Sequence, residues 1–258
     1  MLAKRRHQKI LDLLASSGEV QIQQLAHHFG VSTMTIRRDL EGLADEGLVE
    51  RIHGGAILPR DGDVEPSLAK KQATHQKEKQ EIAAAALKWV VPGMSVILDA
   101  GSTTAAMAER LVEKAPLTVV TTDVGIAQYL SDFPDIQVFL TGGQVKGGVY
   151  RLEGEYTLHL LREVAADLAF IGCDGFTETH VYSNTMAQAS LKQTIMTAAK
   201  ERILLADASK FGKVAFSKVA ALGQFSALVV DAAFGADARA SLRQRGVVVE
   251  QLDIRLTT

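Results

Sequence analysis

Apolar residues recur at helical spacing near the beginning of the chain. The stretch from 20 to 45 carries them on one face of each of two expected helices, at Ile22, Leu25 and Phe29 and then at Ile36, Leu40 and Leu43. Between the two sets, Gly30 can take the left-handed conformation that ends a helix, and Ser32 offers a hydroxyl that can cap the next one. Two short helices joined by such a turn predict a helix-turn-helix.

The polar face of the second expected helix has its positive charges at one end. Arg37 and Arg38 precede Glu41, Asp45 and Glu46, so a helix that enters DNA by its N-terminus keeps the acids outside the groove. In the major groove an arginine can donate to guanine, and a threonine methyl group or a methionine can contact thymine. We therefore expect five residues to reach DNA: Thr33, Met34, Thr35, Arg37 and Arg38.

A two-stranded wing is expected after this helix. Residues 48–53 resemble a strand, Gly54 and Gly55 a hairpin tip, and residues 56–58 the return strand. Such a wing places Arg51 and His53 beside the DNA phosphates. The alternative is an ordinary helical lobe with solvated arginines, but spacing, cap, turn and charge polarity together favour nucleic-acid binding.

The basic charge of the chain is local. Its formal net charge is −2, which is not the balance of a chain that coats nucleic acid along its whole length. A helix expected over residues 3–15 nevertheless begins with a run of cations, at Lys4, Arg5, Arg6 and Lys9. This run either faces a phosphate of the DNA backbone or is a solvated surface.

Continuous apolar runs alternate with helical stretches from residue 75 onward. The strand-like runs cover residues 95–98, 117–121, 136–140, 168–171, 203–205, 228–230 and 247–252. They predict a parallel sheet covered on both faces, and thus a Rossmann-like α/β domain over residues 75–258. Prolines and glycines interrupt the pattern before it, so we expect residues 59–74 to link this domain to a winged helix-turn-helix domain of residues 1–58.

Polar and small residues follow several of these strands, where open α/β sheets bind ligands. Asp99 and residues 101–104 precede a helix whose free amide groups suit an anion. Later strands and their flanking elements add Thr122, Gly142, Gly143, Asp174, Lys192 and Lys210. Each has a plainer interpretation, because glycines also serve sharp turns and a lone lysine on a helix is usually solvated.

Two runs of residues resemble a known family. The segment FGVSTMTIRRDL followed by RIHGGA is similar to the winged helix-turn-helix of the DeoR family of bacterial transcriptional regulators, and DAGST, LTGG, LKQTIM and ADASKFG resemble motifs of its effector domain. The resemblance implies a DNA-binding regulator, usually a repressor. It also implies an effector domain similar to ribose-5-phosphate isomerase and glucosamine-6-phosphate deaminase folds, which senses phosphorylated sugars or sugar derivatives.

The resemblance also assigns roles by position. It implies phosphate contacts at Gly101, Ser102, Thr103 and Thr104, and contacts to sugar hydroxyls or phosphate at Asp99, Asp174, Lys192 and Lys210. Two positions depart from the family pattern and bear on which effector is bound. Gln188 stands where members commonly carry Glu, and Thr122 stands where they tend to have Asn.

An active sugar-phosphate isomerase or deaminase fused to a DNA-binding head is the alternative function. Deaminases of this fold carry an Asp-Gly-His motif, whereas Asp174 and Gly175 are followed here by Phe176. Without a group that titrates near pH 7, proton transfer loses its best candidate, so we expect binding without turnover and no catalytic residue. A large domain that serves oligomerisation alone is a third hypothesis.

The remaining composition restricts cofactors and cellular location. The histidines are scattered and the single cysteine has no CxxC partner, so neither a metal nor another cofactor is expected. No apolar run approaches the roughly 20 residues that span a bilayer, which favours a cytoplasmic protein without membrane contact. Its expected partners are double-stranded operator DNA, a phosphorylated sugar and further copies of the chain in a homodimer or homotetramer.

Overall fold

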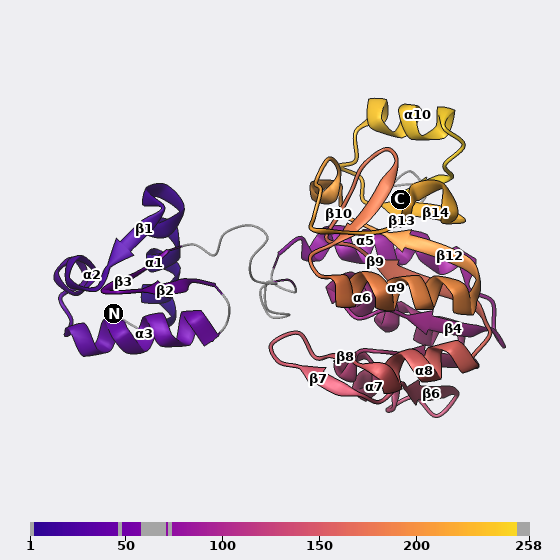
Figure 1. Ribbon diagram of the computed structural model, residues 1–258, viewed down its shortest axis with the longest axis horizontal. Coiled ribbons are helices and arrows are strands. Elements are labelled where there is room, and N and C mark those ends of the chain that lie inside the picture. The colour runs from indigo at the N-terminus through magenta and orange to yellow at the C-terminus, as the bar shows by residue number, and fades with distance from the viewer. Residues whose placement is uncertain (1–2, 46–47, 58–70, 72–73, 252–258) are drawn as a thin grey trace. The chain divides into compact units, whose positions relative to one another are not determined.

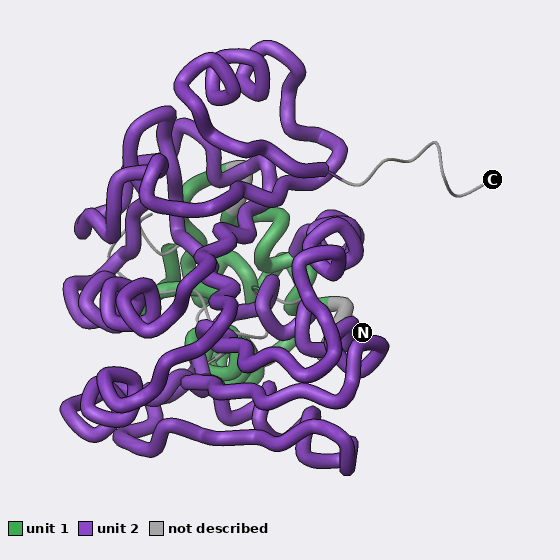
Figure 2. The backbone as a smooth tube through the Cα atoms, turned by 90° about the vertical axis from the view of Figure 1, so that its right-hand side faces the viewer, with its two compact units in different colours: residues 1–73 green, residues 74–258 purple. Residues whose placement is uncertain are grey.

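The computed structural model describes residues 3–45, 48–57, 71 and 74–251 of the chain. It divides into two compact units, residues 1–73 and 74–258 (Figure 2). Most of the linker expected over residues 59–74 lies outside the described residues. Each unit is described by itself below.

The first unit is a winged helix-turn-helix, as the sequence predicted. Its elements are α1 (Ala3–Ser17), β1 (Glu19–Gln21), α2 (Ile22–Phe29), α3 (Thr33–Asp45), β2 (Glu50–Ile52) and β3 (Gly55–Ile57) (Figure 1). The turn forms as expected, since Gly30 has a φ of 62° and the Ser32 hydroxyl accepts the Thr35 amide at 3.1 Å. The buried side chains of Ile10, Leu14, Ile36, Leu40 and Leu43 form the centre of its core.

The wing differs from the prediction in two ways. It has three strands in the order β1-β3-β2, because residues 19–21 before α2 also pair with β3. Gly55 lies inside β3 rather than at the hairpin tip, which His53 and Gly54 form. A glycine is needed at this position inside the strand because a Cβ atom on residue 55 would lie 2.1 Å from the Val20 carbonyl oxygen on the neighbouring strand.

The second unit is built on one parallel sheet of seven strands, which confirms the predicted α/β fold. In spatial order these are β15 (Val249–Gln251), β14 (Ala227–Val230), β12 (Ala199–Leu205), β9 (Ala166–Gly172), β4 (Ser95–Leu98), β5 (Leu117–Thr121) and β6 (Ile136–Leu140). The chain runs from β4 to β6 in one direction and then returns to β9 on the other side of β4. The loops after β4 and β9 therefore diverge, which is where such sheets bind ligands.

Helices cover both faces of this sheet. They are α5 (Gln76–Ala86), α6 (Ser102–Leu111), α7 (Val124–Leu130), α8 (Glu155–Glu163), α9 (Met186–Ala198) and α10 (Ala236–Gln244). One core holds side chains of α5, α6 and α7 with Val96 and Leu98, while the other holds side chains of α8, α9 and α10 with Ile97. Because neighbouring residues of β4 belong to opposite cores, the strand is apolar at successive positions.

Two small antiparallel sheets were not predicted. One is the hairpin of β7 (Gln144–Lys146) and β8 (Arg151–Glu153), which lies beside α7 and α8 (Figure 1). The other has β10 (Gly175–Phe176), β11 (His180–Ser183) and β13 (Ser217–Ala221). Both are formed by segments that follow strands of the large sheet, so they add residues near the carboxyl ends of those strands. Within the described parts of the chain, no helix is long and apolar enough to cross a membrane.

Candidate functional sites

The N-terminal half of α3 presents a surface that fits a DNA groove. Thr33, Arg37 and Arg38 are exposed and Met34 is 55% exposed, which is unusual for a large apolar side chain. Thr35 is half-buried, and its hydroxyl lies 2.9 Å from that of Ser32 in the helix cap. Four of the five predicted contacts are therefore displayed on α3, and the fifth also belongs to the cap.

A buried ion pair fastens α3 to α1. Arg6 donates from Nε to Asp39 Oδ2 at 2.5 Å and from Nη2 to Oδ1 at 2.9 Å, and His7 Nε2 lies 3.1 Å from the same Oδ1. Burial opposes the charged form of Asp39, but the bonds from Arg6 and His7 outweigh it and lower the pKa of Asp39. Arg6 therefore does not belong to the solvated or phosphate-facing run in which the sequence placed it, because its guanidinium is buried against Asp39.

The wing is joined to α3 by a weaker contact. Arg51 Nη1 donates to Glu41 Oε1 at 2.9 Å, and both side chains are about half exposed. Exposed pairs of this kind contribute little stability, typically under about 1 kcal/mol. His53 is exposed in the turn of the hairpin. Both predicted wing residues can thus reach solvent, but the charge of Arg51 is shared with an acid of α3.

Asp99 and Lys192 form the centre of the second candidate site. Asp99 follows β4 and is completely buried, while Lys192 comes from α9 and is 5% exposed. The Lys192 ammonium forms an ion pair with Asp99 Oδ2, and the Gly172 amide at the end of β9 donates to the same oxygen at 3.1 Å. Oδ1 is also buried but has no hydrogen-bond partner. Groups from α9 and from the end of β9 thus bind the carboxylate that follows β4, at the point where the loops after β4 and β9 diverge.

The loop before α6 supplies amide and hydroxyl groups next to Asp99. Gly101 is the N-cap of α6, and Ser102 and Thr103 are half-buried in its first turn. Thr104 is completely buried and donates its hydroxyl to the Gly101 carbonyl at 2.9 Å. Ser102 and Thr103 are therefore placed better than Thr104 for an anion at the start of the helix.

The loop after β5 is tied to the loop after β4. Thr121 donates its hydroxyl to the Leu98 carbonyl at 2.9 Å and accepts the Asp123 amide at 3.1 Å. Thr122 is buried, and its hydroxyl has no partner. Asp123 was not among the predicted site residues, yet it caps α7 through Oδ1 while its Oδ2 is buried without a hydrogen bond.

The two glycines after β6 have a structural explanation. Gly142 and Gly143 have φ angles of 73° and 116°. A Cβ atom on Gly143 would lie 2.3 Å from Thr157 Oγ1 and 2.6 Å from the Glu153 carbonyl oxygen. The Thr157 hydroxyl also donates to the Gly142 carbonyl at 2.7 Å. The positive φ angle explains Gly142, at which a Cβ atom would meet nothing within 4 Å, and close packing of the turn against β8 and α8 explains Gly143.

Charged groups gather around the loop after β9. Asp174 accepts the Asn184 amide at 2.9 Å, which ties this loop to the end of β11. Burial raises the pKa of the Cys173 thiol to about 12, and the charges of Lys210, Asp174, Lys192 and Asp207 also act on it. The predicted residues Asp174, Lys192 and Lys210 therefore lie within electrostatic range of one thiol, although they come from three separate segments of the sequence.

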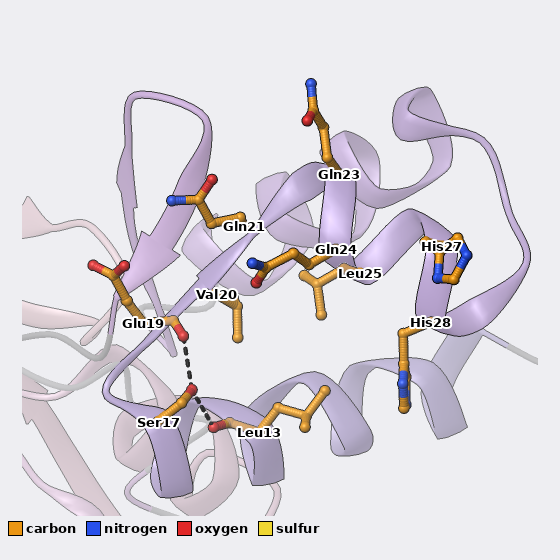
Figure 3. Close-up of a pocket in the computed structure, with 10 residues that line it drawn as sticks. All are labelled: Leu13, Ser17, Glu19, Val20, Gln21, Gln23, Gln24, Leu25, His27 and His28. Carbon is orange, nitrogen blue, oxygen red and sulfur yellow. Dashed lines mark hydrogen bonds between the residues drawn. The ribbon is translucent and has the colours of Figure 1, made fainter.

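A separate hollow of about 630 Å³ lies in the first unit, between α1, β1 and α2 (Figure 3). Leu13, Val20 and Leu25 form its apolar part, and glutamines and histidines of α2 stand around its opening. The hollow is lined by none of the residues predicted to bind DNA or effector. Among the described residues, no cluster of histidine, cysteine and acidic side chains could hold a metal ion.

Both units match known protein domains. Residues 6–61 match the DeoR-like helix-turn-helix domain, and residues 74–232 match the DeoR C-terminal sensor domain. A solved structure to which part of this chain is similar is a ribose-5-phosphate isomerase in complex with phospho-erythronic acid, with 24% identity, a TM-score of 0.39 and coverage of 53% of this chain and 54% of that chain.

Full-length relatives have similar sequences. The HTH-type transcriptional regulator YgbI of Escherichia coli K12 is 36% identical over 90% of this chain and 91% of its own. The glycerol-3-phosphate regulon repressor of Escherichia coli K12 is 30% identical over 90% of this chain and 92% of its own. A putative aga operon transcriptional repressor of Escherichia coli O157:H7 is 30% identical over 95% of this chain and 92% of its own.

Proposed function

The chain belongs to the DeoR family of transcriptional regulators, and from this membership we propose that it represses an operon for carbohydrate catabolism until a phosphorylated sugar or sugar derivative binds its C-terminal domain. It is a DNA-binding regulator with a sensor domain. The relatives named as repressors of the glycerol-3-phosphate regulon and the aga operon support the repressor role and the class of effector.

The display of α3 is the observation that supports operator recognition most directly. Met34, Arg37 and Arg38 project from the half of the helix that enters the major groove in this class of domain. The buried Arg6–Asp39 pair holds the opposite side of the same helix against α1. Thr33, Thr35, Arg51 and His53 complete the proposed DNA contacts.

The effector is proposed to bind at the carboxyl edge of the parallel sheet. The amide groups at the start of α6, which Gly101 caps, and the hydroxyls of Ser102 and Thr103 suit a phosphate. Asp99, Asp174, Lys192 and Lys210 provide charged groups for sugar hydroxyls or phosphate. Thr104, Gly142 and Gly143 shape the loops of this site, and Thr122 offers a buried hydroxyl between them.

We assign the sensor domain a binding role without turnover. The alternative is a deaminase-like enzyme. Deaminases of this fold carry an Asp-Gly-His motif, whereas this chain has Phe176 after Asp174 and Gly175. Phe176 is fully buried and packs on Phe211 and Phe234, with ring centroids 5.4 and 6.1 Å away. An apolar ring in this position cannot transfer a proton, which favours ligand sensing.

We further propose that the regulator acts as a homodimer or homotetramer. Two copies present two α3 helices, and operator half-sites lie one helical turn or a multiple of it apart. An effector that binds better to the DNA-free arrangement of the two DNA-binding domains lowers the affinity for the operator. Because the two binding events are linked, operator DNA lowers the affinity for the effector by the same factor.

Binding to promoter fragments from the organism's own genome, with random duplex as competitor, tests the first half of the proposal. Arg38→Ala is expected to lose about 1–3 kcal/mol at one base position if Arg38 contacts a base, or to weaken all sequences with a smaller salt slope if it contacts phosphate. Arg162→Ala, an exposed arginine of α8, serves as control. Unchanged binding by the double variant Arg37→Ala and Arg38→Ala would contradict the proposed docking.

Thermal denaturation with a panel of sugar phosphates tests the second half. A ligand at ~100 times its Kd adds about 2.7 kcal/mol of stability. Ser102→Ala combined with Thr103→Ala, both at half-buried positions, is expected to keep operator binding and to lose the response to the effector. A panel without any shift would favour a domain that serves oligomerisation alone, and turnover of any member would favour the enzyme.

A further inference from the structure

We propose that Asp123 is a specificity-determining residue of the effector site, where it and Asp99 recognise a hydrogen-bond donor of the ligand, a hydroxyl group or a protonated amine. The inference rests on the proposed binding of an effector at this edge of the sheet. It adds the chemical character of the group that the ligand presents to these two carboxylates.

The two carboxylates come from neighbouring strands. Leu98 and Thr121 are partners in the pairing of β4 with β5, and Asp99 and Asp123 follow one and two residues later. The Thr121 hydroxyl joins the two loops, because it donates to the Leu98 carbonyl and accepts the Asp123 amide. The negative charge of Asp99 also acts on Asp123, so the two side chains lie within electrostatic range of each other.

Each carboxylate has one oxygen in use and one without a partner. Asp99 Oδ2 is taken by Lys192 and the Gly172 amide, while Oδ1 has no hydrogen bond. Asp123 Oδ1 accepts the amides of Gly125 and Ile126 at 2.8 and 3.1 Å, while Oδ2 has no hydrogen bond. Asp99 is completely buried and Asp123 is 1% exposed. Two buried acceptor oxygens at one edge are costly unless a donor reaches them.

Charge indicates which ligands satisfy these oxygens. Lys192 compensates Asp99, but no ion pair of the described residues includes Asp123. Burial raises the pKa of Asp123, and so does the charge of Asp99, against the opposing amides of Ile126, Gly125 and Gly101. Hydroxyl groups or an ammonium group would stabilise the charged form of Asp123. A carboxylate of a sugar acid would add a further negative charge and would be disfavoured.

Helix capping alone does not explain an aspartate at this position. One oxygen suffices for the cap, and asparagine caps helices as well as aspartate does. Asp123→Asn therefore keeps the cap through its amide oxygen, and it replaces the free carboxylate oxygen by a donor. The variant separates a capping role from a ligand-binding role without a large change in shape.

The test measures ligand affinity of the full-length protein by calorimetry. The probes are erythrose 4-phosphate, ribose 5-phosphate, glucose 6-phosphate and glucosamine 6-phosphate, together with the phosphorylated aldonic acid of each aldose. We expect at least one sugar or amino-sugar phosphate to bind, and its matching acid to bind at least about tenfold more weakly. Asp123→Asn is expected to weaken the sugar phosphate about 10- to 100-fold and to reduce the preference over the acid, while the unliganded Tm stays the same or rises.

Asp132→Asn provides the matched control, because Asp132 is exposed in the turn after α7 and carries the same charge. A sugar phosphate that binds Asp123→Asn within about twofold of the wild type, or an acid that binds the wild type as tightly as the sugar, would overturn the inference and leave the effector site standing. Absence of binding by every probe to the wild type would count against the effector site itself, and against this inference with it.

Discussion

Arg6 and Asp39 join the first helix of the chain to the helix that is proposed to read DNA. Two hydrogen bonds of 2.5 and 2.9 Å connect the guanidinium of Arg6 in α1 to the carboxylate of Asp39 in α3, and both side chains are buried. Asp39 directly follows Arg38 in the sequence but points to the other side of the helix. The pair therefore fixes how α3 is rotated, and with it which side chains are displayed.

Removal of one partner of this pair is expected to loosen α3. Arg6→Ala leaves a buried carboxylate without its cation, which costs about 3–5 kcal/mol in comparable cases. Hydrogen exchange of α3 peptides in the full-length protein measures the loss as faster local opening. Arg51→Ala is the control, since it breaks an exposed pair with Glu41 and should change the opening free energy by less than about 1 kcal/mol. Equal effects of the two substitutions would contradict the role given to Arg6.

Acid is expected to weaken the same contact. The folded-state pKa of Asp39 lies below its ordinary value of 3.8, so the carboxylate stabilises the fold fully above that value. This contribution is lost as the pH falls through the lowered pKa and Asp39 becomes protonated. Exchange protection of α3 should therefore drop below about pH 4 in the wild type and drop less in Asp39→Asn. A variant with the same pH profile as the wild type would show that other carboxylates dominate.

Gly143→Ala is expected to destabilise the second unit. The new Cβ atom would lie 2.3 Å from Thr157 Oγ1, and the backbone there has a φ of 116° that side chains rarely adopt. Overpacking and backbone strain together should cost about 2–4 kcal/mol in urea denaturation. Gly147→Ala is the matched control, because nothing lies within 4 Å of the position that its new Cβ atom would take. A small effect at both positions would mean that the turn can shift.

Lys192→Met is expected to be far more costly than Lys200→Met. The first leaves Asp99 buried without its cation, while the second removes an exposed ammonium 2.9 Å from Asp167. The expected losses in the free energy of unfolding are about 3–5 kcal/mol and less than about 1 kcal/mol, measured by urea denaturation. If the two variants are equally stable, the Asp99–Lys192 pair does not support the sheet edge.

Cys173 is expected to react slowly with thiol reagents. Burial raises its pKa to about 12, so very little thiolate exists at pH 8. Because it is the only cysteine, colour development with a disulfide reagent reports on this site alone. The rate in the native protein should be at least about 100-fold lower than in guanidinium chloride. Comparable rates in both solutions would place the thiol in a more open environment.

Local sequence signals were enough for most of the fold. Apolar periodicity located the helices of the first unit, and the Gly30 turn and the Ser32 cap formed as expected. Continuous apolar runs located the strands of the large sheet, which is parallel throughout. The pairing of β1 with β3 was missed because three residues carry no strand signal of their own. The two small sheets were missed because none of their strands is a continuous apolar run.

Long-range partners could not be obtained in this way. Asp99 and Lys192 were both named as candidates, but their ion pair joins positions 93 residues apart. Arg6 resembled its exposed basic neighbours, although it lies where the apolar face of α1 meets α3. An aspartate among the apolar positions of α3 was the available signal for its partner. Asp123 was not a candidate, and its unpartnered oxygen is what distinguishes it from an ordinary helix cap.

Each hydrophobic core formed by the described residues belongs to a single unit. Among these residues, Ile10, Ile36 and their neighbours form one cluster before residue 74, and the clusters on the two sides of the parallel sheet consist of later residues. A DNA-binding domain and a sensor domain that each have their own core can be exchanged between related regulators. A chimera that joins the DNA-binding domain of a relative to this sensor domain should bind the promoters of that relative and still respond to the original effector.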